Sequence, residues 1–574
     1  MARDEITNWL SQARKFQSKG ELGRAETILN QLSRAAPLQP EVHHRLALIY
    51  IATGRHPLAK ASIDRALTQA PGSAAIWKTT IRFARDLADP QAISRLRAGL
   101  EAAPLPKSDR RKLCKSLDAP LRTSQRPAPS IPELRAQGKL RDALAFATAQ
   151  VADFPTPANY STLADCQRDL HLDDAALTTL ETGCAAFPDD PALAERHVIH
   201  LRSLGHGAAY ADALRKARET WPTNAALMLL DANAAAPSHG LLEAVAQQLE
   251  DPDLPAPSKR RLLFAQAKLA EAKGEDFTFL EHANALTRSA FPYDIGPDEL
   301  DVHANQTGFS NGFRSDMEQA ANPDPRPIFI TGLPRSGTTL AERMLATRPG
   351  VASAGEVGWI NRHIRKLLQA PRRDDDARAF ARQMTSRYWT MQRERFPDAT
   401  HIIDKSIPSY AYLGALKTLM PNARIIVMRR DPADTALSLF RNMFVEGRHR
   451  YTNDLEDIAR FMRLFEGQLA FWRKAAPDSF TEIWYEDLVQ TPLETSQALY
   501  AAAGIDWHPG SLDFHAKAGR VDTLSASQVR APIHTGSVGL AARFAKEMEP
   551  FTTLYEKLGA DRPSPDRDQP AQCL

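Results

Sequence analysis

The hydrophobic pattern of the chain changes near residue 325. Upstream, apolar residues recur at the spacing of amphipathic helices, as in HHRLALIYIATGRHPLAKASIDRAL. Downstream, short β-branched runs (PIFITG, THIIDKS, ARIIVMRR and FTEIWYEDL) alternate with amphipathic stretches. This alternation predicts parallel βαβ units, with ligands bound at the carboxyl ends of the strands. The chain is therefore predicted to be multidomain, all-α at its N-terminus and α/β over residues 325–560.

Prolines divide the helical part at a regular interval, with two apolar-periodic helices between successive prolines. Two series recur at steps of roughly 34 residues, namely Pro37, Pro71 and Pro104, then Pro155, Pro188 and Pro222. Over residues 20–235 this pattern resembles a degenerate tetratricopeptide solenoid of about six repeats. The resemblance implies a concave surface that binds a protein or peptide, which is a candidate for the acceptor of a reaction. A purely scaffolding role is the alternative.

The repeats are expected in two blocks. Residues 1–115 form the first block, and residues 135–300 form the second together with a helical extension. Between them, residues 116–134 are rich in proline and predict a hinge. The polar, proline-rich residues 561–574 predict a disordered tail.

Composition narrows the class of protein. A net charge of +3 over 574 residues gives no field that favours nucleic acid, and no window is apolar enough for a membrane span. Four scattered cysteines form no CxxC pair, and no HExxH is present, which argues against structural zinc and a disulfide framework. Since the start MARDEITNWLSQARKF has no apolar signal segment, a cytoplasmic location is expected.

The stretch ITGLPRSGTTL has the GxxxxG spacing of a phosphate-binding loop at Gly332 and Gly337. A predicted strand precedes it and a predicted helix follows, so backbone N–H groups can form an anion site. An ATP-binding loop would have lysine after the second glycine, but this chain has Thr338 and Thr339 there and places Arg335 earlier. Because a triphosphate needs that lysine and Mg²⁺, kinase activity is disfavoured and no metal is expected.

Two segments carry a more specific resemblance. PRSGTTL resembles the 5′-phosphosulfate-binding loop of sulfotransferases that use 3′-phosphoadenylyl sulfate (PAPS). IIVMRRDPADTALSLF resembles the 3′-phosphate-binding segment of that family, with Arg430 after a strand and Ser438 in the next helix. Asp431 is predicted to cap that helix and Pro432 to begin it. The spacing is closest to the tyrosylprotein sulfotransferase branch and to bacterial proteins that join tetratricopeptide repeats to such a domain.

The family resemblance implies roles for further residues. In ASAGEVGWI, Glu356 is the implied general base, while Lys405, Ser525 and Arg335 are implied to stabilise the transferring group. The remaining motifs are IIDKSIPSY around Lys405, WYEDLVQTP at Tyr485 and TLSASQVRAPIH around Ser525. The implied PAPS-binding residues are Arg335, Ser336, Gly337, Thr338, Thr339, Arg430, Ser438, Tyr485, Ser525, Gln528 and Arg530.

Structural alternatives and departures stand beside these roles. Glu356 could be a surface acid, Asp404 and Lys405 a solvated ion pair, and Tyr485 a core residue. Glu486 and Asp487 are expected to cap the next helix rather than to catalyse. The departures from the family pattern are Val357 in place of its second acid, Asn442 in place of an arginine, and Leu540 in place of a basic residue.

The predicted activity is sulfonyl transfer from PAPS to an acceptor hydroxyl, with a protein or peptide tyrosine as the favoured acceptor. A carbohydrate hydroxyl is the first alternative. A repeat-based interaction protein with an inactive nucleotide-binding domain is the second, and Leu540 and Val357 are the features that favour it.

Overall fold

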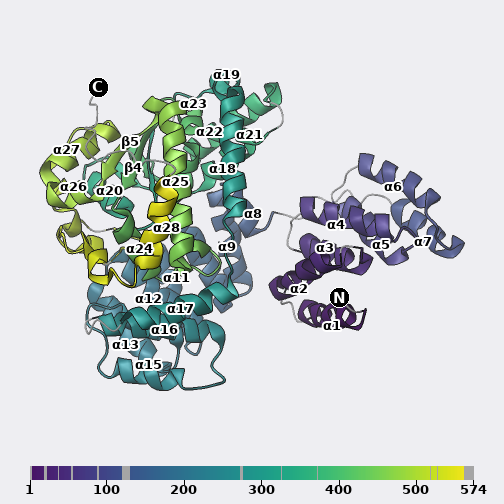
Figure 1. The fold of residues 1–574 in the computed structure, drawn as a ribbon, viewed down its shortest axis with the longest axis horizontal. Coiled ribbons are helices and arrows are strands. Elements are labelled where there is room, and N and C mark those ends of the chain that lie inside the picture. The colour runs from purple at the N-terminus through teal and green to yellow at the C-terminus, as the bar shows by residue number, and fades with distance from the viewer. Residues whose placement is uncertain are drawn as a thin grey trace. The chain divides into compact units, whose positions relative to one another are not determined.

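The computed structural model divides the chain into two compact units, Met1–Pro129 and Ser130–Leu574 (Figure 1). The structure describes residues 3–18, 22–36, 38–52, 56–86, 90–118, 129–271, 276–324, 326–370, 373–517, 519–526 and 528–560. The predicted tail, Pro37 and residues 119–128 of the predicted hinge lie outside these ranges.

The first unit is built of helices. They are α1 (Arg3–Ser18), α2 (Leu22–Ala35), α3 (Pro40–Ala52), α4 (His56–Gln69), α5 (Ala74–Asp86), α6 (Pro90–Ala102) and α7 (Lys107–Asp118). Leucines such as Leu29 and Leu46 fill the core between the first helices. Pro71 follows α4 and Pro104 follows α6, so each of these prolines ends a helix pair, as the repeat pattern predicts.

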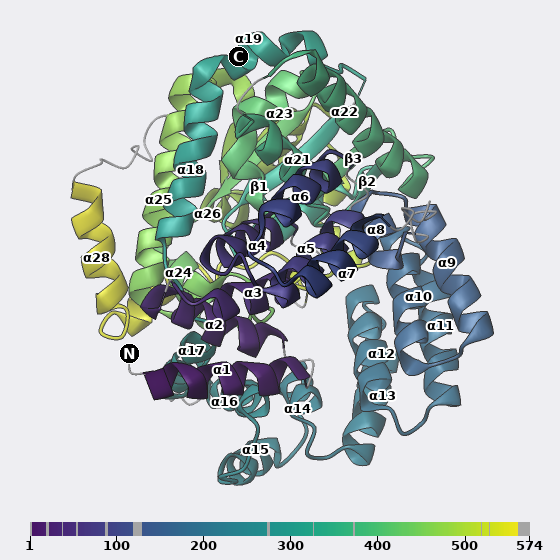
Figure 2. The ribbon, with the colours of Figure 1, turned by 90° about the vertical axis from the view of Figure 1, so that its right-hand side faces the viewer.

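The second unit begins with more helix pairs, which Figure 2 shows stacked side by side from α9 to α13. Pro155, Pro188 and Pro222 again follow the second helix of a pair. The residue after each proline turn caps the next helix through its side chain, as Asp190 does for α12. These helices are α8 (Ile131–Ala136), α9 (Leu140–Asp153), α10 (Pro157–Asp169), α11 (Asp173–Ala186), α12 (Pro191–Leu204), α13 (Gly207–Thr220), α14 (Ala225–Ala232), α15 (Leu241–Leu249), α16 (Ala256–Ala270) and α17 (Asp276–Ala290). The predicted helical solenoid is confirmed.

The α/β part contains a five-stranded, fully parallel sheet in the order β2-β3-β1-β4-β5. Its strands are β1 (Pro327–Gly332), β2 (Val351–Ser353), β3 (His401–Asp404), β4 (Arg424–Arg429) and β5 (Thr481–Trp484). Every residue of β1 is buried, as expected for a strand covered by helices on both faces. The chain leaves β1 toward β2 on one side and later returns to β4 on the other, so the end of β1 is a switch point where such folds bind ligands. The predicted parallel α/β domain is confirmed.

The remaining helices run from α18 to α28, and the first two, α18 and α19, precede β1. They are α18 (Gly296–Gly308), α19 (Arg314–Met317), α20 (Thr338–Leu345), α21 (Trp359–Leu368), α22 (Asp375–Arg395), α23 (Leu413–Leu419), α24 (Pro432–Phe440), α25 (Leu455–Ala475), α26 (Tyr485–Gln490), α27 (Pro492–Ala503) and α28 (Glu549–Ala560). The longest, α22 and α25, carry charged residues along their length. In the part of the chain that the structure describes, no helix combines the length and the apolar character needed to cross a bilayer.

The second repeat block and the α/β part share one hydrophobic core. Leu140 of α9, Leu170 after α10 and Phe277 of α17 belong to the same cluster as Phe329 of β1 and Trp472 of α25. Polar contacts cross the same boundary. Arg387 Nη2 donates to Gly138 O at 2.7 Å and Asn284 Nδ2 to Phe440 O at 2.9 Å; Arg260 pairs with Glu446. The described residues from Ser130 to Ala560 therefore pack as a single body.

Candidate functional site

The loop between β1 and α20 has the backbone geometry of an anion cradle. Gly332 and Gly337 bracket it with φ values of 142° and 95°. A Cβ on Gly332 would lie 2.5 Å from the carbonyl oxygen of Met428, so only glycine fits there. Since no side chain caps the N-terminus of α20, its first N–H groups remain free for a ligand. Thr338 and Thr339 are buried at this end of the helix.

Replacing Gly337 with alanine is expected to destabilise the second unit by about 1–3 kcal/mol. At φ 95° an L side chain is strained, and the added Cβ would lie 2.8 Å from Cδ2 of Tyr485. Urea denaturation followed by tryptophan fluorescence measures the change. Gly207→Ala is the matched control, because no atom lies within 4 Å of a Cβ there. A Gly337→Ala midpoint equal to that of the parent protein would contradict the prediction.

Arg335 is the hub of the candidate site. Its Nε donates to Ser438 Oγ at 3.0 Å, an Nη donates to Ser525 Oγ, and its Nη2 donates to Gln528 Oε1 at 2.9 Å. Its backbone is left-handed, with φ 71°. Burial, with the neighbouring charge of Arg430, lowers the pKa of Arg335 to about 10. The side chain stays cationic at neutral pH and joins the loop, α24 and the segment around Ser525.

Arg430 reaches the same loop from the end of β4. Its Nη1 donates to Arg335 O at 2.9 Å and its Nη2 to Ser537 O at 2.7 Å. Its guanidinium lies 4.7 Å from the ring centroid of Tyr485, while its Nε is buried without a partner. The preceding Arg429 instead forms ion pairs with two glutamates, Glu466 and Glu482. Of the two consecutive arginines, Arg430 is therefore the one that faces the loop.

The predicted start of α24 is confirmed. Asp431 is the N-cap, with its carboxylate accepting from the N–H of Asp434 at 2.9 Å, and Pro432 is the first helical residue. The capping role expected for Glu486 and Asp487 is wrong, because both lie inside α26, whose N-cap is Trp484. Glu486 Oε1 instead accepts from the N–H of Asp431 at 2.8 Å, which is a structural role at the start of α24.

Lys405 and Glu356 form a second group at the ends of β3 and β2. Lys405 Nζ donates to Glu356 Oε1 at 2.7 Å and lies 4.0 Å from Glu342 Oε2. The Lys405 side chain is 1% exposed and that of Glu356 53%, so the lysine is buried while the glutamate stays accessible. Burial alone would lower the pKa of Lys405, but the carboxylates of Glu342 and Glu356 outweigh it and raise the pKa. Asp404 is also buried, so the solvated Asp404–Lys405 pair is ruled out.

Not every residue singled out from the sequence joins these groups. Arg530 turns away, and its Nη2 donates to Ser203 O of the repeat block at 2.7 Å. Leu540 and Val357 pack against the shared core, and Asn442 Nδ2 donates to Ser438 O at 2.7 Å. Ser336 Oγ donates to Leu333 O at 2.7 Å, within the loop itself.

Two titratable residues near Lys405 and Glu356 were missed from the sequence. Burial raises the pKa of Glu342, and Ser353 Oγ donates to its Oε1 at 2.6 Å. Burial lowers the pKa of His449, and the negative charge of Glu356 offsets part of this decrease. Glu342 could have been found as the acid within the apolar face of α20. Among the described residues, no group of three or more His, Cys, Asp and Glu side chains is arranged to hold a metal ion.

The α/β part is similar to known proteins. A model of the sulfotransferase family matches residues 327–509. A protein of Aquifex aeolicus described as uncharacterized is 25% identical over 326 residues, covering 54% of this chain and 43% of its own. Protein-tyrosine sulfotransferase 1 of Danio rerio is 25% identical over 218 residues, covering 36% of this chain and 61% of its own. The chain therefore spans less than two thirds of the length of either relative.

A solved structure is also similar. The sulfotransferase domain of the Synechococcus PCC 7002 olefin synthase is 20% identical, with 39% of this chain and 96% of that chain covered and a TM-score of 0.24. The family model, in contrast, matches residues 327–509 directly. Residues 327–509 therefore form a domain of the sulfotransferase family, in a chain whose N-terminal part is a helical-repeat solenoid.

Proposed function

We propose that the chain transfers the sulfonyl group of PAPS to the hydroxyl of a tyrosine in a protein or peptide. The observation that carries this proposal is the convergence on Arg335. Its guanidinium contacts Ser438 of α24 and both Ser525 and Gln528 of a later segment, and the two segments lie far from Arg335 and from each other in the sequence. The family resemblance assigns these residues to one nucleotide.

The residues of the loop fit an anionic donor. Arg335 and Arg430 repel one another, and among the described residues neither forms an ion pair with a carboxylate. The buried Nε of Arg430 has no partner, and the N-terminus of α20 has no side-chain cap. Phosphate and sulfate oxygens would satisfy these donors. Tyr485, whose ring lies under Arg430, would stack on the adenine.

The chemistry assigned to the chain is an in-line transfer. The acceptor oxygen bonds to sulfur as the bond from sulfur to the 5′-phosphate oxygen breaks. Glu356 takes the hydroxyl proton, and adenosine 3′,5′-bisphosphate leaves with the electron pair. Lys405, Arg335 and Ser525 stabilise the charge that develops on the transferring group and the leaving oxygen.

The tyrosine acceptor is supported by the Danio rerio relative, which is a protein-tyrosine sulfotransferase. The half-exposed carboxylate of Glu356 is also accessible to a side chain presented by another protein. The helical repeats are proposed to bind that protein. Offering tyrosine peptides and oligosaccharides with PAPS decides between acceptors, since sulfation of oligosaccharides alone would replace the tyrosine proposal.

The donor site predicts a selective thermal shift. Adenosine 3′,5′-bisphosphate at about 100 times its Kd is expected to stabilise the protein by about 2.7 kcal/mol without Mg²⁺. ATP, with or without Mg²⁺, is expected to have little effect, because the loop lacks the lysine that binds a triphosphate. Differential scanning fluorimetry on the full chain measures both. A Mg²⁺-dependent response to ATP alone would overturn the proposed donor.

A further inference from the structure

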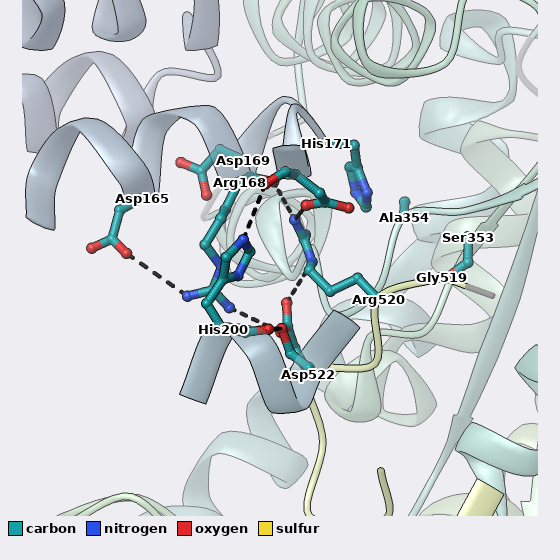
Figure 3. A network of polar contacts seen from close by, with 12 residues as sticks. Asp165, Arg168, Asp169, His171, His200, Ser353, Ala354, Gly519, Arg520 and Asp522 are labelled. Atoms are coloured by element: carbon teal, nitrogen blue, oxygen red, sulfur yellow. Dashed lines mark hydrogen bonds and ion pairs between the residues drawn. The ribbon is translucent and has the colours of Figure 1, made fainter. Parts of the chain in front are cut away.

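A turn of the second repeat block lies between two segments of the proposed active site. It joins α10 to α11 and runs from Arg168 to Asp173. His171 within it has φ 56°, a left-handed conformation that residues other than glycine seldom adopt. Figure 3 shows His171 close to Ala354, and Arg168 linked to Arg520 and Asp522.

On one side the turn holds a segment that we call the strap, residues 519–526 and 528–530. Arg520 Nη1 donates to Arg168 O at 2.9 Å, and Arg520 also pairs with Asp173. Asp522 of the strap accepts from Arg168 Nη2 at 2.9 Å and also forms an ion pair with Arg520, whose Nε lies 2.8 Å from Asp522 Oδ2. The Arg520 side chain is 11% exposed, so this contact is largely shielded from water. Such a pair holds its geometry better than an exposed one.

The strap has further contacts with the repeats and with Arg335. The N–H of Val521 donates to Ser203 O at 2.8 Å, and Arg530 donates to the same oxygen. Its opposite side presents Ser525 and Gln528 to Arg335. The strap therefore connects the repeat block to the proposed donor site.

On the other side the turn supports the loop that carries Glu356. Arg395 of α22 donates from Nε to Asp169 O at 2.9 Å and from Nη2 to His171 Nε2 at 2.8 Å. The same Nη2 donates to Ala354 O at 2.9 Å, two residues before Glu356. Because an arginine can only donate, His171 Nε2 must accept and the imidazole must be neutral. Burial, with the charges of Arg395 and Arg520, lowers the pKa of His171 to about 2, consistent with that state.

We propose that the turn Arg168–Asp173 is a positioning element of the sulfotransferase site, which fixes the strap through Arg520 and the Glu356 loop through His171 and Arg395. This inference rests on the proposed function. The repeat block would then help to fix the geometry of the active site, in addition to any role in binding a partner. None of these residues touches the reacting atoms, so each is a positioning residue.

Hydrogen exchange tests the positioning without any ligand. In the full chain, Arg520→Ala is expected to speed exchange at the strap amides of Val521, Ala526 and Val529, since the strap loses its anchor. Arg215→Ala is the control, because it removes exposed ion pairs with Asp212 and Glu219 on α13 of the same block, and neither carboxylate pairs with a residue of the turn or the strap. Asp173→Asn removes the same Arg520 pair with little change in volume and replaces Arg520→Ala if that variant fails to fold. Strap exchange at the parental rate in the folded variant would overturn the proposal.

Binding and turnover then separate the two sides of the turn. Arg520→Ala is expected to weaken adenosine 3′,5′-bisphosphate roughly two- to thirtyfold, the range of residues that act on a site from outside it. His171→Gly relieves the left-handed strain and removes the acceptor of Arg395, so kcat is expected to fall by up to about 100-fold with donor Kd unchanged. His171→Gln, which keeps an acceptor, is expected to recover part of kcat.

The outcomes of these measurements are distinct. Parental kcat in His171→Gly together with parental Kd in Arg520→Ala would overturn the positioning role. A parent protein that binds no adenosine 3′,5′-bisphosphate, but whose strap loosens in Arg520→Ala, would overturn the proposed function and leave the positioning role standing.

Discussion

Glu356→Gln is expected to lower kcat for sulfonyl transfer by about 10²–10⁴-fold, the usual contribution of a general base. Glutamine keeps the size of the side chain and an oxygen that can accept from Lys405, but it cannot take a proton from the acceptor. Donor affinity should therefore stay at the parental value, because Glu356 is not part of the loop that contains Arg335 and that Arg430 contacts. Single-turnover rates with PAPS, with calorimetry for adenosine 3′,5′-bisphosphate, measure the two quantities separately.

Glu342→Gln is the matched control for this substitution. Both carboxylates lie near Lys405, but the Glu342 side chain is only 7% exposed and that of Glu356 is 53% exposed. A buried carboxylate on α20 cannot receive the proton of an incoming tyrosine, so Glu342→Gln should cost less activity. If Glu356→Gln keeps the parental rate, or if Glu342→Gln alone abolishes transfer, Glu356 is not the base.

Arg335→Asn is expected to lower kcat by about 10²–10³-fold, as the loss of one preorganised donor does. It should also weaken adenosine 3′,5′-bisphosphate, since Ser438, Ser525 and Gln528 would lose their common partner. Asparagine is chosen because it tolerates the left-handed backbone at φ 71°, where alanine would add strain of its own. Turnover and calorimetric titration of the full chain measure the two effects.

Arg348→Ala is the control for the loss of an arginine in this region. Arg348 follows α20 and pairs with the exposed Asp506 at 3.0 Å. It shares no hydrogen-bond partner with Arg335 among the described residues. A surface pair of this kind contributes about 0–1 kcal/mol, so donor binding should be unchanged. Equal donor affinity in Arg335→Asn and in the parent would contradict the role of Arg335 as the hub.

Much of the fold could be predicted because its signals are local. The proline interval marked the helix pairs, and runs such as ARIIVMRR marked four of the strands. Strand β2 was missed, because Val351–Ser353 is too short to show an apolar run. The core that contains both Phe277 and Phe329 could not be predicted either. Contact between two distant segments does not change the hydrophobic periodicity of either segment.

In the candidate site, too, the features with local sequence signals could be predicted and those that depend on distant segments could not. The residues within PRSGTTL and the helix start after Arg430 follow from local motifs. The direction of a long side chain does not, and Arg530, assigned to the donor by resemblance, faces Ser203 of the repeats. A single sequence also gives no signal for the burial of Lys405 between two glutamates or for the turn at His171.

The core shared by the repeats and the α/β part determines where this protein can be cut or recombined. A fragment of residues 325–560 would expose the apolar faces that now meet Leu140 and Phe277, and it would lose the anchors of the strap. The first unit, by contrast, has its own core around Leu29 and Leu46 and ends at Pro129. The two units therefore have separate cores on either side of Pro129, and a gene fusion that replaces the first unit would leave the core of the second unit intact.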